Sequence, residues 1–315
     1  MPDIEAIREA GRRARGGEDL PETIQGPIIH APVWTWEVPL YFWFGGMAAG
    51  SSFVALACDL AGDETSARVA RLVALGALAP SPPLLIMDLG RPMRFYKMLR
   101  IFKPRSPMSM GVWALTAFGN LAAAAVGADL LGRKREAKVL GGANAVVGGY
   151  LGSYTGVLLA STAVPVWGRS RLFLGPIFVS TAAATGAAAT RLALVASGLP
   201  VGHPTRRALG TVETAAMTAE LILSIINERR LGPLAGGLEK GRPGTLFKAA
   251  KWAVRVGLSL RLARRRGGPG VHHVASLLYL AAGLLFRYAW VGAGRLSARD
   301  DRAVAEMHRT EAHGT

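Results

Sequence analysis

The sequence has a single cysteine, Cys58, among its 315 residues. One thiol excludes an internal disulfide and any cluster ligated by several cysteines of this chain. Histidine is also scarce, and we expect all six to lie in tails, loops or helix ends rather than facing one another from different apolar segments. Neither a haem held by two histidines nor a zinc site is expected. If the protein takes part in redox chemistry, the metal centres are predicted to belong to a partner.

Acidic residues are few: 21 Asp and Glu stand against 37 Lys and Arg, which gives a net charge of +16. In a soluble protein such an excess would indicate nucleic-acid binding. Here the basic residues fall in short segments between apolar runs, as is usual in multi-pass membrane proteins, so nucleic acid is not an expected partner. The first 30 residues are polar and lack the apolar core of a cleaved signal peptide.

Apolar runs of about 18 or more residues, long enough to cross a bilayer, recur along the chain. We predict an all-α integral membrane protein with polar tails at 1–33 and 294–315 and eight spans, at 38–60, 69–89, 110–131, 139–162, 172–194, 209–226, 246–262 and 271–291. The seventh span is ambiguous, because Lys248, Lys251 and Arg255 share one helical face. It either crosses the membrane, with its lysines reaching one surface, or lies in the interface.

Eight spans place both tails on one side of the membrane, together with the loops after the second, fourth and sixth spans. The start of the first span, the loop 88–107 and the end of the fourth span then share this side, which we call the motif face. It carries more Lys and Arg than the opposite side. The positive-inside rule therefore predicts that the motif face and both termini are cytoplasmic, with the protein in the cell membrane.

The first span begins with residues suited to a flat, redox-active ring. Glu37 and Tyr41 are four residues apart, so they lie on one helical face. Tryptophans flank them and small residues follow, namely Trp34, Trp36, Gly45, Gly46 and Gly50. A quinol loses two protons as it loses two electrons, and a Glu or Tyr near a ring oxygen suits that transfer. The alternative is an aromatic belt with Glu37 at a helix start.

Two further segments on the motif face carry unusual polar residues. Tyr154, near the end of the fourth span, could reach the same depth as Tyr41, although a lone tyrosine is more often bonded to a backbone carbonyl. Asp88 ends the second span, where the helix dipole disfavours a carboxylate, so we expect Arg91 or Arg94 as its partner. The many basic residues of loop 88–107 predict a docking surface for another subunit. The alternative is a helix terminator with a surface ion pair.

Two carboxylates are predicted deep in the second half of the chain. Glu213 and Glu220 are seven residues apart and face the same way, and buried carboxylates in membrane helices often belong to proton paths. The alternative is structural: an ion pair with Arg191 or Arg287, or a protonated carboxyl bonded to a neighbouring helix.

Several ordered motifs resemble the polysulfide reductase membrane-subunit family, also called the NrfD-like family. They are PLYFWFGGMAAG at 39–50, DLGRP at 88–92, SPMSMGVW at 106–113, YTGVLLA at 154–160, PVW at 165–167 and LFLGP at 172–176. The resemblance implies two four-helix bundles, at 34–168 and 169–293, and a quinone pocket near the membrane surface in the first. The family's pocket residues correspond by position to Glu37, Tyr41 and Tyr154. Trp113, which closes one of the motifs, is expected to contribute to cofactor binding. Some relatives carry an amide and a histidine in place of Glu37 and Tyr41.

The resemblance also implies a docked ferredoxin-like iron–sulfur subunit, usually joined to a molybdopterin catalytic subunit. The sequence thus predicts a membrane subunit that exchanges electrons between a quinone, with menaquinone expected, and that partner, and that is not catalytic alone. One rival is an anchor without quinone chemistry. Another is a transporter or proton pump that relies on Glu213 and Glu220.

Overall fold

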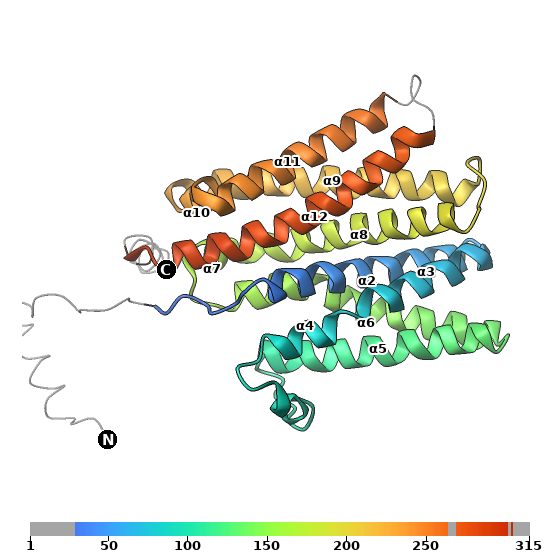
Figure 1. Cartoon of the computed structure of the whole chain (residues 1–315), viewed down its shortest axis with the longest axis horizontal. Coiled ribbons are helices and arrows are strands. Elements are labelled where there is room, and N and C mark those ends of the chain that lie inside the picture. Colours follow the sequence, from blue (N-terminus) through green and yellow to red (C-terminus); the bar gives the residue numbers. More distant parts are fainter. Residues whose placement is uncertain (1–28, 264–268, 302–303, 305–315) are drawn as a thin grey trace, which may run out of the picture.

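The computed structural model describes residues 29–263, 269–301 and 304, and none of them lies in a strand. The described part is all-helical (Figure 1). Most of the two predicted polar tails lies outside the described residues. The helices are α2 (Glu37–Leu60), α3 (Glu64–Leu78), α4 (Ser81–Met87), η1 (Pro92–Leu99), α5 (Pro107–Leu130), α6 (Lys134–Ala160), α7 (Pro165–Arg169), α8 (Arg171–Ala196), α9 (Pro204–Leu231), η2 (Gly232–Ala235), α10 (Gly236–Glu239), α11 (Gly241–Leu262) and α12 (Pro269–Ser297).

Each predicted apolar run corresponds to a long helix, and the second run is broken. α3 ends at Leu78 and α4 begins at Ser81, with Pro82 and Pro83 in its first turn. Proline cannot donate a backbone hydrogen bond and its ring clashes with the preceding turn, so these two prolines account for the break.

Six helical segments are long and apolar enough to cross a membrane: Glu37–Leu60, Glu64–Met87, Pro107–Leu130, Arg171–Ala196, Pro204–Glu239 and Gly270–Ser297. α6 and α11 are of similar length but more polar. α6 opens with a cluster of charged residues, and α11 carries the basic residues that made the seventh span ambiguous. The described residues therefore support a protein with several membrane spans, and the count of eight remains a prediction.

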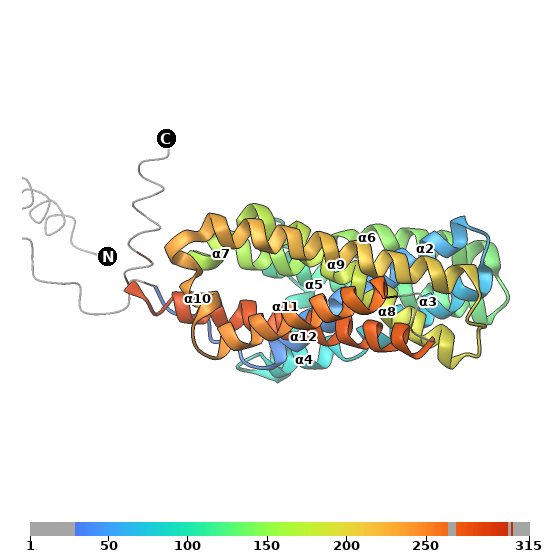
Figure 2. The same cartoon turned by 90° about the horizontal axis from the view of Figure 1, so that it is seen from above.

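All the long helices run along one axis, in the view of Figure 1 and when the molecule is turned by 90° (Figure 2). Helices α2 to α6 form the lower half of Figure 1 and α8 to α12 the upper half. Small residues let α2 and α8 approach closely where the halves meet. A Cβ atom on Gly50 would overlap the carbonyl oxygen of Ala182, and one on Gly186 would overlap the backbone of Gly50.

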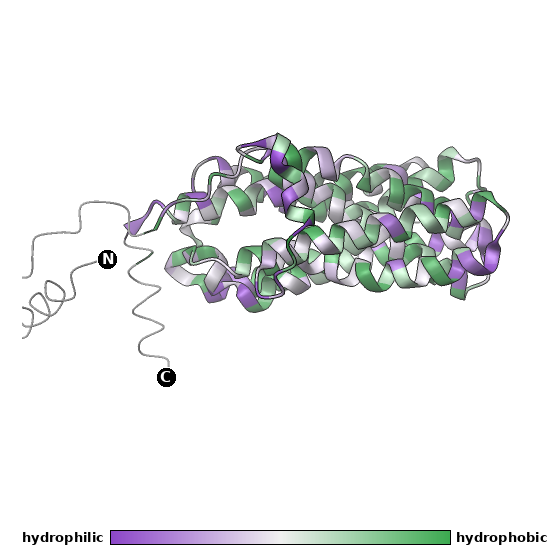
Figure 3. Cartoon of the chain, turned by 90° about the horizontal axis from the view of Figure 1, so that it is seen from below, coloured by the Kyte–Doolittle hydropathy of each residue, from purple (hydrophilic) through white to green (hydrophobic). Residues whose placement is uncertain are grey.

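Hydrophilic residues gather at the two ends of the molecule, and hydrophobic ones dominate the middle (Figure 3). At the end opposite the motif face, Arg71 of α3 pairs with Asp59 of α2 at 2.6 Å and with Asp129 of α5 at 2.5 Å. Nearer the middle, the buried Arg287 of α12 donates from Nε to the carbonyl oxygen of Phe42 of α2 at 2.9 Å. These bonds fasten three helices of the first half together and tie that half to the second.

Candidate functional site

A small cavity of about 50 Å³ lies at the motif face, between the start of α2, the end of α4, the start of α5 and the end of α6. Its polar lining comes from Tyr41, Tyr154 and Asp88. The rest is aromatic, aliphatic or sulfur-containing: Trp34, Val38, Phe42, Leu85, Leu89, Met98, Met108, Gly111, Val112 and Leu158. The structure thus brings together the two tyrosines that the sequence singled out and adds an aspartate to them.

The two tyrosines are buried, with 5% and 4% of their surface exposed, yet their hydroxyls have no partner among the described residues. Tyr154 is therefore not the carbonyl-bonded core tyrosine that was the alternative interpretation. Its ring lies directly against Gly111, where any Cβ atom would overlap it. Both hydroxyls can donate to, or accept from, a ligand in the cavity.

The expected ion pair of Asp88 with Arg91 or Arg94 is not formed in the described structure, and the nearby charge that acts on Asp88 is that of Glu37. Both arginines are exposed instead. Burial, and then the nearby charge of Glu37, raise the pKa of Asp88 above its ordinary value. Asp88 therefore accepts a proton at a higher pH than a solvated aspartate does.

This arrangement predicts an inverted pH dependence of stability. A carboxyl whose pKa is raised by folding contributes stability below its unfolded pKa and loses that contribution as the pH rises through the folded pKa. We expect Asp88→Asn to remove this loss, so that the melting temperature of the variant rises relative to that of wild type as the pH increases above about 4. Thermal unfolding in detergent measures the difference.

Glu136→Gln, which changes an exposed carboxylate at the start of α6, is the control and should follow wild type at every pH. If the wild-type protein instead gained stability relative to Asp88→Asn as the pH rises, the carboxylate of Asp88 would have a favourable partner and this account would fail.

Glu37 lies beside the cavity without lining it. It is half-buried at the first position of α2 and accepts a hydrogen bond from the hydroxyl of Thr35. The negative charge of Glu37 acts electrostatically on both Asp88 and Tyr288 of α12. The spacing argument correctly placed Glu37 near Tyr41, but the side chain stands nearer the surface than the tyrosine does.

The family model described as "Polysulphide reductase, NrfD" matches residues 27–233. The chain belongs to this family. Among curated proteins, the C subunit of the polysulfide reductase of Wolinella succinogenes is 33% identical over 92 residues, which make up 27% of this chain and 29% of that protein. The match thus covers less than a third of this relative. Together with the apolar helices, family membership identifies a multi-pass membrane protein.

Some residues that the sequence assigned to ring binding lie elsewhere in this NrfD-family protein. Trp36 is 51% exposed, and its carbonyl oxygen accepts a hydrogen bond from Tyr288 at 3.0 Å. Gly46 faces Arg287, and Gly50 packs against α8. A Cβ atom on Gly45 would have no neighbour within 4 Å. None of the four lines the cavity, and Gly46 and Gly50 face the second half of the chain instead.

Trp113 supports the loop rather than the cavity. Its indole nitrogen donates to the carbonyl oxygen of Ile101 at 3.2 Å, and its ring packs edge-on against Phe102. The hydroxyl of Ser109 donates to the same carbonyl at 3.2 Å. The SPMSMGVW motif therefore does two things: Met108 and Gly111 line the cavity, and Ser109 and Trp113 hold the preceding loop in place.

Gly111 was not predicted as a site residue, and Trp34 was expected only to flank Glu37 and Tyr41. Gly111 gives room for Tyr154, and the only sequence signal was its place inside a motif. Trp34 stacks on Trp167 with ring centroids 5.3 Å apart, and its carbonyl oxygen accepts a hydrogen bond from Arg295 at 2.9 Å. These partners come from the second half of the chain, so no local pattern could have indicated them.

An apolar groove of about 280 Å³ adjoins the cavity, lined by residues of α3, α4, η1 and α5. The groove and the cavity share Leu85, Leu89, Met98 and Val112. Methionine side chains are unbranched and repack easily, so the side chain of Met98, which lies between the groove and the cavity, can change its conformation.

The loop 88–107 projects basic and apolar side chains together. η1 has no buried residue, and six basic residues accompany exposed large apolar ones: Met93, Phe95, Tyr96, Leu99, Ile101 and Phe102. Exposed apolar clusters with a polar rim are typical of protein–protein interfaces.

The two buried glutamates of α9 have different surroundings. Glu213 pairs with Arg261 of α11 at 2.5 Å and accepts a hydrogen bond from Ser276 at 2.8 Å, so its partner is neither Arg191 nor Arg287. Glu220 accepts a hydrogen bond from Ser224 at 2.7 Å beside a cavity of about 10 Å³. That volume suffices for about one water molecule. A proton path through Glu213 and Glu220 therefore stays a prediction.

Proposed function

We propose that this NrfD-family protein is the quinone-reactive membrane subunit of an oxidoreductase complex. In this proposal a membrane quinone, with menaquinone as the expected species, exchanges electrons with a ferredoxin-like iron–sulfur subunit that is itself joined to a molybdopterin catalytic subunit. The observation that carries the proposal is the pair of unpartnered tyrosine hydroxyls beside Asp88 in one buried cavity. The finer architecture, eight spans in two four-helix bundles, belongs to the same proposal.

The lining residues fit a quinone in kind. Ligand sites are mostly apolar with a few polar groups that fix orientation, and here two phenols and a carboxyl stand in an aromatic and methionine-rich wall. The cavity itself is too small for a ring, so Met98 and Met108 have to shift to admit one. The adjoining groove offers an apolar path along α4 and α5 for an isoprenoid tail.

The quinone, when bound, would supply the two-electron chemistry. The chain's own residues would bind it and move its protons. Tyr41 and Tyr154 would hold ring oxygens by hydrogen bonds. Asp88, whose pKa is raised, would take up a released proton. The half-exposed Glu37, which lies nearer the surface, would receive the proton next.

Electron transfer also needs a partner close to the cavity, because the chain has a single cysteine with which to ligate a cluster. Asp88 lines the cavity, and the exposed loop that follows it would dock the iron–sulfur subunit through its basic rim and apolar side chains. Partner docking and quinone binding would thus use two sides of one short segment.

The experiment measures quinol-linked electron transfer in membranes that carry the complete complex. A hydrogen bond to a group that gains charge contributes about 1.5–3 kcal/mol, so Tyr154→Phe should lower the rate roughly ten- to a hundredfold. Glu37→Gln removes the carboxylate that would receive the proton from Asp88, so it should lower the rate as well. Tyr150→Phe is the matched control: its ring centroid lies 6.0 Å from that of Tyr154, but Tyr150 does not line the cavity.

Assembly is checked by co-purification of the iron–sulfur subunit. A reduced rate with intact assembly supports the site. Unchanged rates in both variants would favour the rival interpretation, an anchor without quinone chemistry. An equal loss in Tyr150→Phe would indicate a general packing defect.

A further inference from the structure

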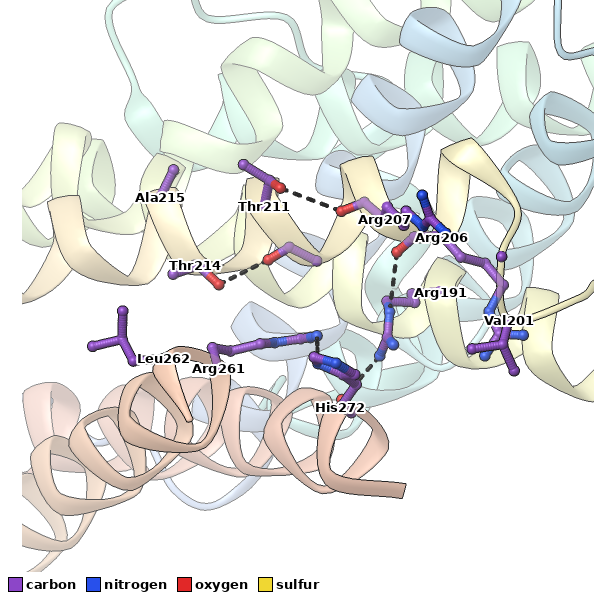
Figure 4. Close-up of a pocket in the computed structure, with 12 residues that line it drawn as sticks. Arg191, Val201, Arg206, Arg207, Thr211, Thr214, Ala215, Arg261, Leu262 and His272 are labelled. Carbon is purple, nitrogen blue, oxygen red and sulfur yellow. Dashed lines mark hydrogen bonds between the residues drawn. The ribbon is translucent and has the colours of Figure 1, made fainter. Parts of the chain in front are cut away.

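A cavity of about 490 Å³ lies at the end of the molecule opposite the motif face. Figure 4 shows the residues that line it. The end of α8, the start of α9, the end of α11 and the start of α12 enclose it. Its polar lining consists of Arg191, Arg206, Arg207, Arg261, His272 and the threonines of α9. It is separate from the tyrosine cavity, and the function proposed above makes no use of it.

The cavity has an excess of positive charge. Four arginines line it, and among the described residues only Arg261 of the four forms an ion pair, with Glu213. Arg191 donates to the carbonyl oxygens of Arg206 and His272, at 3.2 and 2.9 Å. Carbonyl oxygens satisfy donors but do not cancel charge, so burying these cations is costly unless an anion accompanies them.

Two of the guanidinium groups, those of Arg206 and Arg261, still have hydrogen-bonding capacity. Arg191 and Arg206 are only 5% and 4% exposed, so their positions are built into the fold rather than spread over the surface. The Nε atoms of Arg206 and Arg261 are buried and have no hydrogen-bond partner within the described chain. Clustered arginines with free donors are the usual means of holding a phosphate group.

The shape of the cavity distinguishes an amphiphile from a free ion. α11 and α12 diverge from α9 towards this end of the molecule (Figure 1), and the cavity lies in the resulting wedge. The arginines of α8 and α9 gather at one side of the close-up, while Ala215 and Leu262 lie at the other (Figure 4). Ala215 and Leu262 are exposed on this apolar side, and the exposed Thr211, whose hydroxyl donates to the carbonyl oxygen of Arg207, lies between them and the arginines (Figure 4). Along two turns of α9 the lining of the cavity thus changes from charged side chains to apolar surface.

We propose that this wedge binds an anionic phospholipid. The phosphate of its headgroup sits among Arg206, Arg207 and Arg261, and an acyl chain runs along α9 past Thr211 and Ala215. α9 begins at Pro204, so the positive end of its dipole adds to the attraction for the phosphate. The lipid joins the α11–α12 pair to α8 and α9 where these helices splay apart.

The test measures binding of a fluorescent phosphatidylglycerol to the purified complete complex in detergent, with three competitors: unlabelled phosphatidylglycerol, phosphatidylcholine and inorganic phosphate. Each basic residue near a membrane surface contributes about 1 kcal/mol of attraction for an anionic lipid, so Arg207→Gln should weaken binding about fivefold and Arg207→Glu about tenfold or more. Both changes are at an exposed side chain, so folding should survive.

Arg229→Glu is the matched control, because Arg229 is an exposed arginine at the other end of the same helix. The proposal holds if only phosphatidylglycerol competes and only the Arg207 variants weaken binding. Equal weakening by Arg229→Glu would mean non-specific attraction to a basic surface. Competition by inorganic phosphate as strong as that by phosphatidylglycerol would make this a free-anion site. Either result, or an absence of binding, overturns the proposal and leaves the quinone site untouched.

Discussion

Replacing Arg71 by leucine is expected to lower the free energy of unfolding by about 3–5 kcal/mol. Arg71 donates to Asp59 at 2.6 Å and to both carboxylate oxygens of Asp129, at 2.5 and 3.0 Å. The three side chains are only 5%, 5% and 9% exposed. The substitution would leave two carboxylates close together and shielded from water without a counter-charge. Unfolding of the purified protein by increasing SDS in mixed micelles measures the loss.

An exposed ion pair at the same end of the molecule provides the control. Lys134 pairs with Glu64 at 2.6 Å, and both side chains are largely exposed, so Lys134→Ala should change stability little. Adding Asp59→Asn and Asp129→Asn to the Arg71 variant should restore part of the stability, because these changes remove the two carboxylate charges that have lost their partner. Equal effects of the Arg71 and Lys134 variants would show that burial does not strengthen the Arg71 cluster.

Gly50→Ala is expected to destabilise the protein by about 3 kcal/mol, near the upper end of the usual cost of overpacking. The added methyl group would overlap the carbonyl oxygen of Ala182 and lie 3.1 Å from the Cα atom of Gly186. Both are backbone atoms, so no side chain can rotate away and α2 must move from α8. A lower melting temperature of the purified protein in detergent checks this.

Gly45→Ala provides a control of opposite sign within the same helix. A Cβ atom at Gly45 meets nothing within 4 Å, and alanine favours a helix over glycine by about 1 kcal/mol. This variant should therefore be as stable as wild type or more stable. If both substitutions lowered the melting temperature equally, the close approach of α2 and α8 would not be the cause.

The positions of the long helices could be predicted from the sequence because long apolar runs are typical of membrane helices. The break between α3 and α4 was predictable for the same local reason, since Pro82 and Pro83 lie within the run. The crossing of α2 and α8 was not. Gly50 fits against Ala182 only because α2 and α8, which are more than a hundred residues apart in the sequence, come together at these two residues. No pattern in a single sequence indicates which helices pack together in this way.

The site was predictable to the extent that topology determines it. The predicted spans placed Tyr41 and Tyr154 on one face, and the cavity contains both. The partner of Asp88 was wrongly predicted, because nearness in sequence suggested Arg91 or Arg94 and η1 turns both arginines outward. The partner of Glu213 lies on α11, the helix whose position the sequence left ambiguous, so that ion pair could not be predicted.

The bonds that hold the start of α2 have a consequence for biosynthesis. Trp34 stacks on Trp167 and accepts a hydrogen bond from Arg295, and Trp36 accepts one from Tyr288 of α12. A polypeptide inserting from its N-terminus makes α2 long before α12 and can complete these contacts only after α12 has left the ribosome. Maturation of the tyrosine cavity is thereby delayed until α12 has been synthesised, so a protein truncated before α12 would present an unfinished surface to its proposed redox partner.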